Sequence, residues 1–140
     1  MLAQKEHGSP HYVRLVEELE YYPLLEEAQQ IRYGDRFKHE GTNVNLVAPY
    51  EDSLKVRTYE RGVEGETLAC GTGVVACAIA TFLHRKEQKN NFIIETLGGK
   101  MTVSFDYENE QFTNVELKGP ATFVYAVSYT HLTLPTILRV

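Results

Sequence analysis

The spacing of hydrophobic and polar residues predicts a strand and a short helix in the first quarter of the chain. Residues 11–20 alternate between apolar and polar side chains, which is typical of a strand that enters a loop. Residues 23–33 repeat apolar side chains at helical intervals and begin with Pro23, a residue suited to the first turn of a helix. Because Gly34 follows, we expect an amphipathic helix that ends there.

Alternation returns in two neighbouring segments further along the chain. Residues 42–50 and 52–61 both alternate apolar and polar positions. The residues between them, from Pro49 to Asp52, are typical of a turn. The simplest interpretation is a pair of strands joined as a hairpin.

From Gly73 onward the pattern has no polar face. Apolar or small side chains occupy almost every position up to Leu83, and the basic residues His84, Arg85 and Lys86 come only after them. A helix that is apolar all round must be buried. Its basic end would then lie near the negative end of the helix dipole.

Three more strand-like segments follow, at residues 92–99, 100–110 and 112–128, with turns expected at 98–99 and 108–111. Together with the earlier segments they form a run of antiparallel strands around one central helix. We therefore expect an α+β domain in which an antiparallel or mixed sheet makes a barrel-like wrap around that buried helix.

Length, charge and cysteine content narrow the class of protein. A chain of 140 residues is the size of one domain, and its 14 basic and 19 acidic residues give a net charge of -5 without any basic stretch. Nucleic acid is therefore not an expected partner. The chain has no apolar run near 18 residues and no apolar signal core, so we expect no membrane segment and a cytoplasmic protein. Two cysteines and no Cys/His cluster provide neither a disulfide framework nor a metal site.

One of the two cysteines occupies an unusual position. Cys70 stands directly before Gly71-Thr72-Gly73 and the apolar helix. The glycines allow a tight turn and Thr72 is suited to capping, so unpaired N–H groups should converge on Cys70. Such a site favours a thiolate and binds a carboxylate. The alternative is ordinary packing of a small apolar residue, which we expect for Cys77 two turns deeper.

A thiol at a helix start can be a nucleophile, a redox centre or a proton carrier. A nucleophile needs a nearby histidine, which His11 could supply, but also an orienting Asn or Asp motif, and none is obvious. Redox chemistry prefers Cys-x-x-Cys, which is absent. A proton carrier fits better, because Glu60 and Arg61 precede the Gly-rich loop and can lie near a substrate ammonium and carboxylate.

Four separated motifs resemble one family. They are GSPH at 8–11, EGTNVN at 40–45, YERGVEGETLACGTG at 59–73 and LKGPATFVY at 117–125. Over roughly residues 5 to 126 they resemble, in the right order, the C-terminal half of diaminopimelate epimerase. The resemblance implies an isomerase of lysine and peptidoglycan-precursor biosynthesis that interconverts LL- and meso-2,6-diaminopimelate and needs no cofactor.

The resemblance also implies roles for individual residues. In the family two cysteines on opposite faces of the substrate α-carbon act as base and acid, and Cys70 matches the second of them. His11 and Glu60 match residues that relay protons and set the ionisation of the thiols. The matching substrate-binding positions are Ser9, Asn43, Glu60, Arg61, Gly71 and Thr72.

Some of these residues have simpler alternatives. His11 could cap a turn after the preceding proline, Asn43 could be a turn residue, and Glu60 and Arg61 could form a surface ion pair. Ser9 stands where the family commonly has Asn, and the loop after Arg61 is one residue longer than its shortest form.

The largest departure concerns the other half of the site. The family's first cysteine lies in an N-terminal domain within a Cys-Gly-Asn-Gly motif, which this sequence lacks. We therefore expect residues 1–127 to be a C-terminal domain without its N-terminal domain, inactive alone. A truncated gene product or a split enzyme with a separate N-terminal chain would explain this, and a homodimer is possible. Other hypotheses are a non-catalytic binding or assembly domain and a proline racemase-like isomerase.

The last 13 residues differ in composition from the rest. Residues 128–140 contain Pro135 within an apolar stretch and no acidic side chain. They are either a genuine C-terminal strand or interaction tail, or read-through of non-coding sequence. We favour the second interpretation, a non-native tail.

Overall fold

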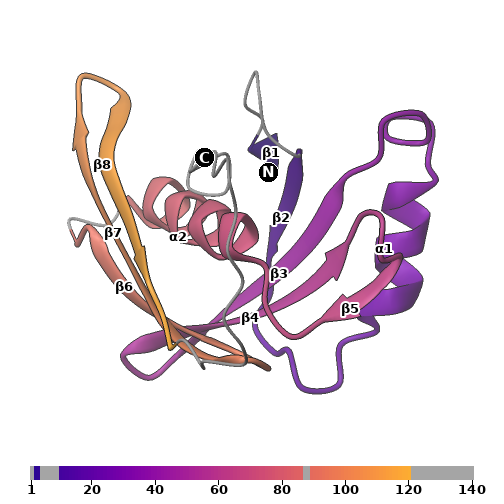
Figure 1. Cartoon of the computed structure of the whole chain (residues 1–140), viewed down its shortest axis with the longest axis horizontal. Coiled ribbons are helices and arrows are strands. Elements are labelled where there is room, and N and C mark those ends of the chain that lie inside the picture. Colours follow the sequence, from indigo (N-terminus) through magenta and orange to yellow (C-terminus); the bar gives the residue numbers. More distant parts are fainter. Residues whose placement is uncertain (1, 4–9, 87–88, 121–140) are drawn as a thin grey trace, which may run out of the picture.

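The computed structural model of the chain describes residues 2–3, 10–86 and 89–120. Within these ranges the chain forms two helices and eight strands of one sheet (Figure 1). The helices are α1 (Leu24–Arg32) and α2 (Gly71–Arg85), and the strands are β1 (Leu2–Ala3), β2 (His11–Leu15), β3 (Asn43–Tyr50), β4 (Ser53–Glu60), β5 (Gly65–Thr67), β6 (Asn91–Thr96), β7 (Gly99–Glu108) and β8 (Gln111–Lys118).

The sheet curls around α2. Its strands follow the order β1-β2-β3-β4-β6-β7-β8, and the short β5 pairs with β4 outside this path. Figure 1 shows α2 in the hollow of the curl, with α1 against the outer side near β5. This half-barrel around a central helix confirms the expected fold class.

The strand directions are mixed. The hairpin of β3 and β4 is antiparallel, as expected, and its turn lies at residues 51–52. The sheet is mixed, which the expected antiparallel or mixed class allows, because β2 pairs with β3 and β4 pairs with β6 in parallel. A helix lies between the two strands of each parallel pair and returns the chain to the starting edge, so the second strand runs the same way as the first.

Both faces of the central strands are buried. One face packs on α2, where Val13, Val47 and Val56 join a core with Val74 and Cys77. The opposite face packs on α1, through a second core. Its buried members are Leu19, Leu24, Ala28, Val44, Leu46, Ala48 and Tyr59. Since side chains of a strand alternate between faces, odd-numbered residues of β3 point toward α2 and even-numbered ones toward α1.

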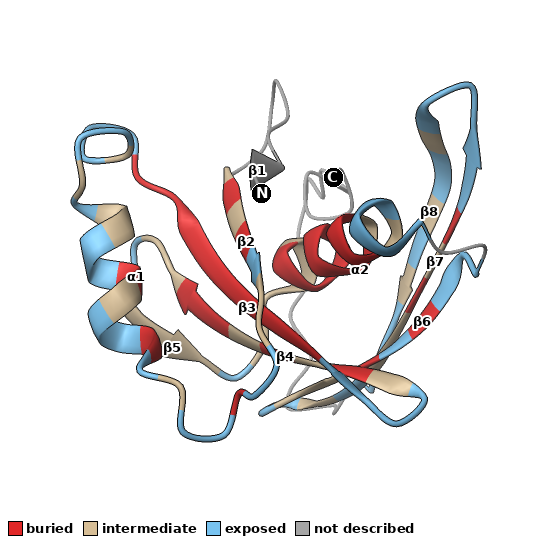
Figure 2. Ribbon diagram, turned by 180° about the vertical axis from the view of Figure 1, so that it is seen from behind, coloured by how far each residue is buried: buried red, intermediate tan, exposed pale blue. Residues whose placement is uncertain are grey.

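Helix α2 is largely buried, as its apolar pattern predicts (Figure 2). It begins at Gly71, two residues before the all-apolar pattern that starts at Gly73, and Cys70 is its N-cap residue. The side chain of Cys77 is fully buried, which confirms its packing role. The basic residues His84 and Arg85 occupy the last turn, as expected for the negative end of the helix dipole.

The shortest and the last of these strands differ from the sequence-based expectation. The three-residue strand β5 was not predicted, and the last predicted strand is described only as β8, since residues 121–128 lie outside the described ranges. Of the helices in the described part of the chain, neither is long and apolar enough to cross a bilayer.

Candidate active site

Cys70 lies at the start of α2 and is a partly exposed residue with a free thiol. Its extended backbone ends the incoming loop, and its carbonyl accepts the Val74 N–H at 2.9 Å as the first bond of the helix. No side chain caps this end, so the expectation that Thr72 caps the helix was wrong. The Thr72 hydroxyl instead lies 3.5 Å from Cys70 Sγ and 2.9 Å from His11 Nε2.

His11 connects the sheet to the helix start. It is the first residue of β2 and is only 5% exposed, so the proposed turn-capping role was wrong. Its Nε2 faces Thr72, and its Nδ1 lies 3.1 Å from Asn45 Nδ2. Burial, assisted by the positive charge of Arg61, lowers the pKa of His11 to about 4. The imidazole is therefore neutral at pH 7.

Asn43 holds the segment that follows β4. It lies opposite His11 in the parallel β2–β3 pair and is 4% exposed, so it is not a turn residue. Its Oδ1 accepts the backbone N–H of Arg61 at 2.7 Å. The Arg61 guanidinium donates from Nη1 to the carbonyl of Glu40 at 2.6 Å. The start of β3 and the residue after β4 are thus joined, with Arg61 close enough to influence His11.

The loop after Arg61 is anchored on the other side of the sheet. Glu64, in a left-handed conformation with φ of 54°, accepts hydrogen bonds from Tyr59 Oη at 2.8 Å and from Arg32 Nε at 3.2 Å. Its backbone N–H donates to the carbonyl of Glu60 at 2.8 Å. The longer loop is therefore fixed against β4 and α1, directly beyond Glu60.

Strand alternation places Glu60 with the other polar residues. Because Glu60 and Thr58 have the same parity as the residues of β4 that pack on α2, both lie on the face that carries His11 and Asn43. The structure thus assembles the predicted residues Cys70, Thr72, His11, Asn43 and Arg61, with Gly71 at the helix start and Glu60 on the same face. Ser9 lies outside the described residues.

Sequence reasoning missed one residue of this cluster. Asn45 is fully buried and contacts both His11 and Thr58, so the chain has an Asn beside His11 although no orienting motif is obvious in its sequence. The alternation of residues 42–50 already places Asn43 and Asn45 on one face. A buried polar residue at an inward position is a signal that could have found it.

The arrangement is suited to proton transfer. The free thiol of the partly exposed Cys70 lies at a helix N-terminus, where N–H groups stabilise negative charge, and the neutral imidazole of His11 is connected to it through Thr72. Among the described residues, no three His, Cys, Asp or Glu side chains are grouped so that they could hold a metal ion.

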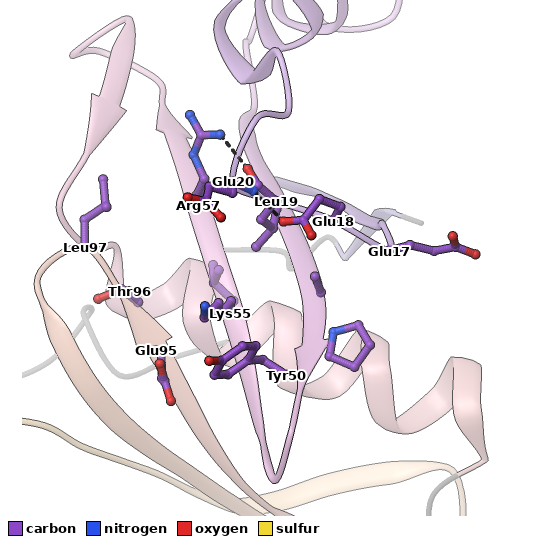
Figure 3. A pocket seen from close by; sticks show the side chains of 13 residues that line it. Glu17, Glu18, Leu19, Glu20, Tyr50, Lys55, Arg57, Glu95, Thr96 and Leu97 are labelled. Atoms are coloured by element: carbon purple, nitrogen blue, oxygen red, sulfur yellow. Dashed lines mark hydrogen bonds between the residues drawn. The ribbon is translucent and has the colours of Figure 1, made fainter.

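A separate cavity of about 420 Å³ lies between residues 17–20, the end of the β3–β4 hairpin and the end of β6 (Figure 3). None of the predicted site residues that the structure describes lines it. Both basic residues that line it contact neighbouring side chains. Arg57 donates to Glu66 at 2.7 and 2.9 Å. Lys55 Nζ lies 3.5 Å from the centre of the Tyr50 ring. Nothing in this cavity connects it to Cys70.

The sequence of the chain is similar to those of known proteins. The family profile described as "Diaminopimelate epimerase" matches residues 3–124. A diaminopimelate epimerase of Flavobacterium psychrophilum is 47% identical over 119 residues, which are 84% of this chain and 46% of that protein. The Aquifex aeolicus diaminopimelate epimerase is 45% identical over 114 residues, 80% of this chain and 40% of that protein. The chain thus spans less than half the length of these relatives.

Solved structures are similar in fold. A crystal structure of a phenazine biosynthesis protein of the PhzF family from Enterococcus faecalis has a TM-score of 0.56 at 18% identity and covers 73% of this chain and 36% of its own. The structure of a protein from Pseudomonas aeruginosa described as a "Predicted Epimerase" has a TM-score of 0.54 at 10% identity and covers 76% of this chain and 36% of its own. At these identities the similarity concerns the fold alone.

Proposed function

Since the chain belongs to the diaminopimelate epimerase family, we propose that it supplies one wall of the active site of a cofactor-independent isomerase acting on 2,6-diaminopimelate. In this role Cys70 is one of two acid/base thiols. The observation that carries the proposal is the hydrogen-bonded connection from Cys70 through Thr72 to a buried, neutral His11. It supports a thiol that gains and loses a proton rather than one that only packs.

The proposed reaction inverts the substrate α-carbon by two proton movements. In one direction the Cys70 thiolate takes the α-proton, and the electron pair of the C–H bond stays on the substrate. A second thiol on the opposite face then gives its own proton to the same carbon. Cys70 ends as a thiol and the other group as a thiolate, so protons and charge balance, and the reverse reaction exchanges the two roles.

In this proposal the first turn of α2 binds the substrate carboxylate. A carbanion next to a carboxylate needs fixed donors, because no cofactor delocalises its charge. The N–H groups of Gly71 and Thr72 lie in the first turn of α2, where unpaired donors and the helix dipole favour a carboxylate. Glu60 and Arg61, at the end of β4, would contact the substrate's charged groups, and Asn43 would hold Arg61 in place.

The second thiol has to come from outside this domain. Within the described residues the other cysteine, Cys77, is fully buried in the core, and burial raises the pKa of its thiol. We propose that an N-terminal domain, in the same polypeptide or a separate chain, carries the second thiol, and that residues 1–127 alone do not epimerise. The family match ends at residue 124, which supports treating residues 128–140 as outside this domain. Because both cysteines, Cys70 and Cys77, are free thiols, we propose that the protein works in the cytoplasm, where thiols are kept reduced.

Co-expression tests the proposal. We expect the chain, combined with an N-terminal domain that carries Cys-Gly-Asn-Gly, to exchange the α-proton of diaminopimelate for deuterium in D₂O, measured by NMR. Cys70→Ala should abolish the interconversion of LL- and meso-diaminopimelate, because the second thiol alone can exchange an α-proton on its own face but cannot return one to the opposite face, whereas the matched control Cys77→Ala should retain the interconversion. No exchange in any pairing, or interconversion that survives Cys70→Ala, would contradict the proposal. The first outcome would favour a non-catalytic binding domain.

A further inference from the structure

Asn45 is held in one orientation at the centre of the sheet. Its side chain is fully buried, and its Nδ2 lies 3.2 Å from the backbone carbonyl of Tyr12. A carbonyl oxygen only accepts hydrogen bonds, so the amide nitrogen, and not the amide oxygen, must point to this side. The oxygen, Oδ1, accepts the Thr58 hydroxyl at 3.0 Å on the other side. The orientation of the amide is therefore determined by its neighbours.

This orientation determines which nitrogen of His11 carries the proton. Asn45 Nδ2 has two hydrogens, one for the Tyr12 carbonyl and one for His11 Nδ1 at 3.1 Å. Because an amide nitrogen only donates, His11 Nδ1 must accept. A neutral imidazole has one N–H, which must then be on Nε2, facing Thr72 Oγ1 at 2.9 Å.

The direction of the hydrogen bonds continues to the sulfur. When the Thr72 oxygen accepts from His11 Nε2–H, the hydroxyl hydrogen is left to point elsewhere, and Cys70 Sγ lies 3.5 Å away. Each bond then donates toward Cys70, which is the direction that stabilises a thiolate. With the opposite tautomer, Thr72 would have to donate to His11 Nε2 and could not donate to Cys70.

We propose that Asn45 is a positioning residue that fixes His11 as the Nε2–H tautomer, so that the Thr72 hydroxyl donates to Cys70 Sγ. The catalytic meaning of this arrangement rests on the proposed function, but the arrangement itself is a property of this chain alone. Asn45 has hydrogen bonds to His11, Tyr12 and Thr58 but not to the thiol, so it acts on Cys70 through His11.

The packing of α2 supports a precise position for this amide. A Cβ atom on Gly73 would lie 2.4 Å from Asn45 Oδ1, so the first turn of the helix rests directly on the side chain. The same turn carries Thr72. The amide and the hydroxyl are therefore placed by one contact between β3 and α2 as well as by their hydrogen bonds.

The first test is the tautomer of His11 in the unaltered chain. We expect long-range ¹H–¹⁵N NMR spectra of ¹⁵N-histidine-labelled chain at pH 7.5 to show His11 protonated on Nε2, with its signals assigned by their loss in His11→Gln. In Asn45→Asp the carboxylate only accepts, so we expect a proton on Nδ1. A Nδ1–H tautomer in the unaltered chain, or an unchanged tautomer in Asn45→Asp, would overturn the proposal.

The second test is the reaction of Cys70 with iodoacetamide at pH 7.5. Loss of one hydrogen bond to a charged sulfur should slow alkylation by about tenfold in Asn45→Asp. Thr72→Val should slow it similarly and keeps the test valid if Asn45→Asp does not fold. The matched control is Thr81→Val, which removes a buried hydroxyl bound to the Cys77 carbonyl in the same helix. An unchanged rate in Thr72→Val would overturn the proposal.

The two proposals can fail separately. If the His11 tautomer and the alkylation rates behave as expected but no pairing with an N-terminal domain exchanges the α-proton, the positioning role of Asn45 stands and the proposed function fails. If α-proton exchange is restored but the unaltered chain shows the Nδ1–H tautomer, the positioning role fails and the proposed function stands.

Discussion

Gly73→Ala is expected to destabilise the folded chain, although alanine is the better helix former. The added Cβ would lie 2.4 Å from Asn45 Oδ1. Asn45 cannot retreat easily, because it is fully buried and bonded to Thr58, Tyr12 and His11. Something must therefore shift, and the amide has the contacts to lose.

The magnitude follows from two opposing contributions. Alanine in place of glycine stabilises a helix by about 1 kcal/mol. Moving the Asn45 amide would weaken or break three hydrogen bonds, each worth about 1 kcal/mol net. The difference is a loss of about 2 kcal/mol in the free energy of unfolding.

Urea unfolding followed by far-UV circular dichroism measures this difference, provided that the slope with urea is unchanged. The matched control is Gly65→Ala, because a Cβ built there meets no atom within 4 Å and the backbone is not left-handed. We expect that control to be neutral or to stabilise by up to about 1 kcal/mol.

A double substitution isolates the contact. In an Asn45→Ala background the obstructing amide is absent, so Gly73→Ala should change sign and stabilise the chain. If Gly73→Ala is neutral or stabilising in the otherwise unaltered chain, the close contact between α2 and Asn45 is refuted, and with it part of the support for the positioning role.

Two further outcomes are expected. Since the His11 pKa of about 4 in the folded chain lies below its value of 6.5 when unfolded, the unfolded chain binds the extra proton between these pH values. The free energy of unfolding should therefore be highest above pH 6.5 and fall by about 3 kcal/mol toward pH 4. His11→Gln should remove this fall in urea titrations, and an equal fall in that variant would contradict the assignment. Because burial raises the pKa of the Cys77 thiol, Ellman's reagent should titrate one thiol in the native chain and two in urea; a native count of two would show that Cys77 is accessible.

The sequence predicts what depends on local pattern. The all-apolar run after Gly73 predicts a buried helix, and alternation predicts the β3–β4 hairpin, since both signals are set by neighbouring residues. Strand direction is different, because parallel and antiparallel strands share the same period of two. The parallel pairs of β2 with β3 and of β4 with β6 therefore leave no mark in the alternation.

In the site, too, some features follow from local sequence and others depend on residues far away in the chain. The position of Cys70 before two glycines identifies the helix start from local sequence alone. Thr72 has the right residue type for a cap, but its hydroxyl bonds to His11, which is 61 positions away. Asn45 was missed for a similar reason, since its partners come from β2 and β4. Competition between local and distant hydrogen-bond partners is decided by the fold.

The hydrogen bonds around His11 join residues separated by up to 61 positions, across β2, β3, β4 and α2. Contacts of such long range form only when most of the chain has reached its native arrangement, and they belong to the slower part of folding. No excised peptide can reproduce this environment. Cooperative unfolding of the half-barrel therefore removes the site, and a substitution that weakens the half-barrel reduces the population of intact sites together with that of folded molecules.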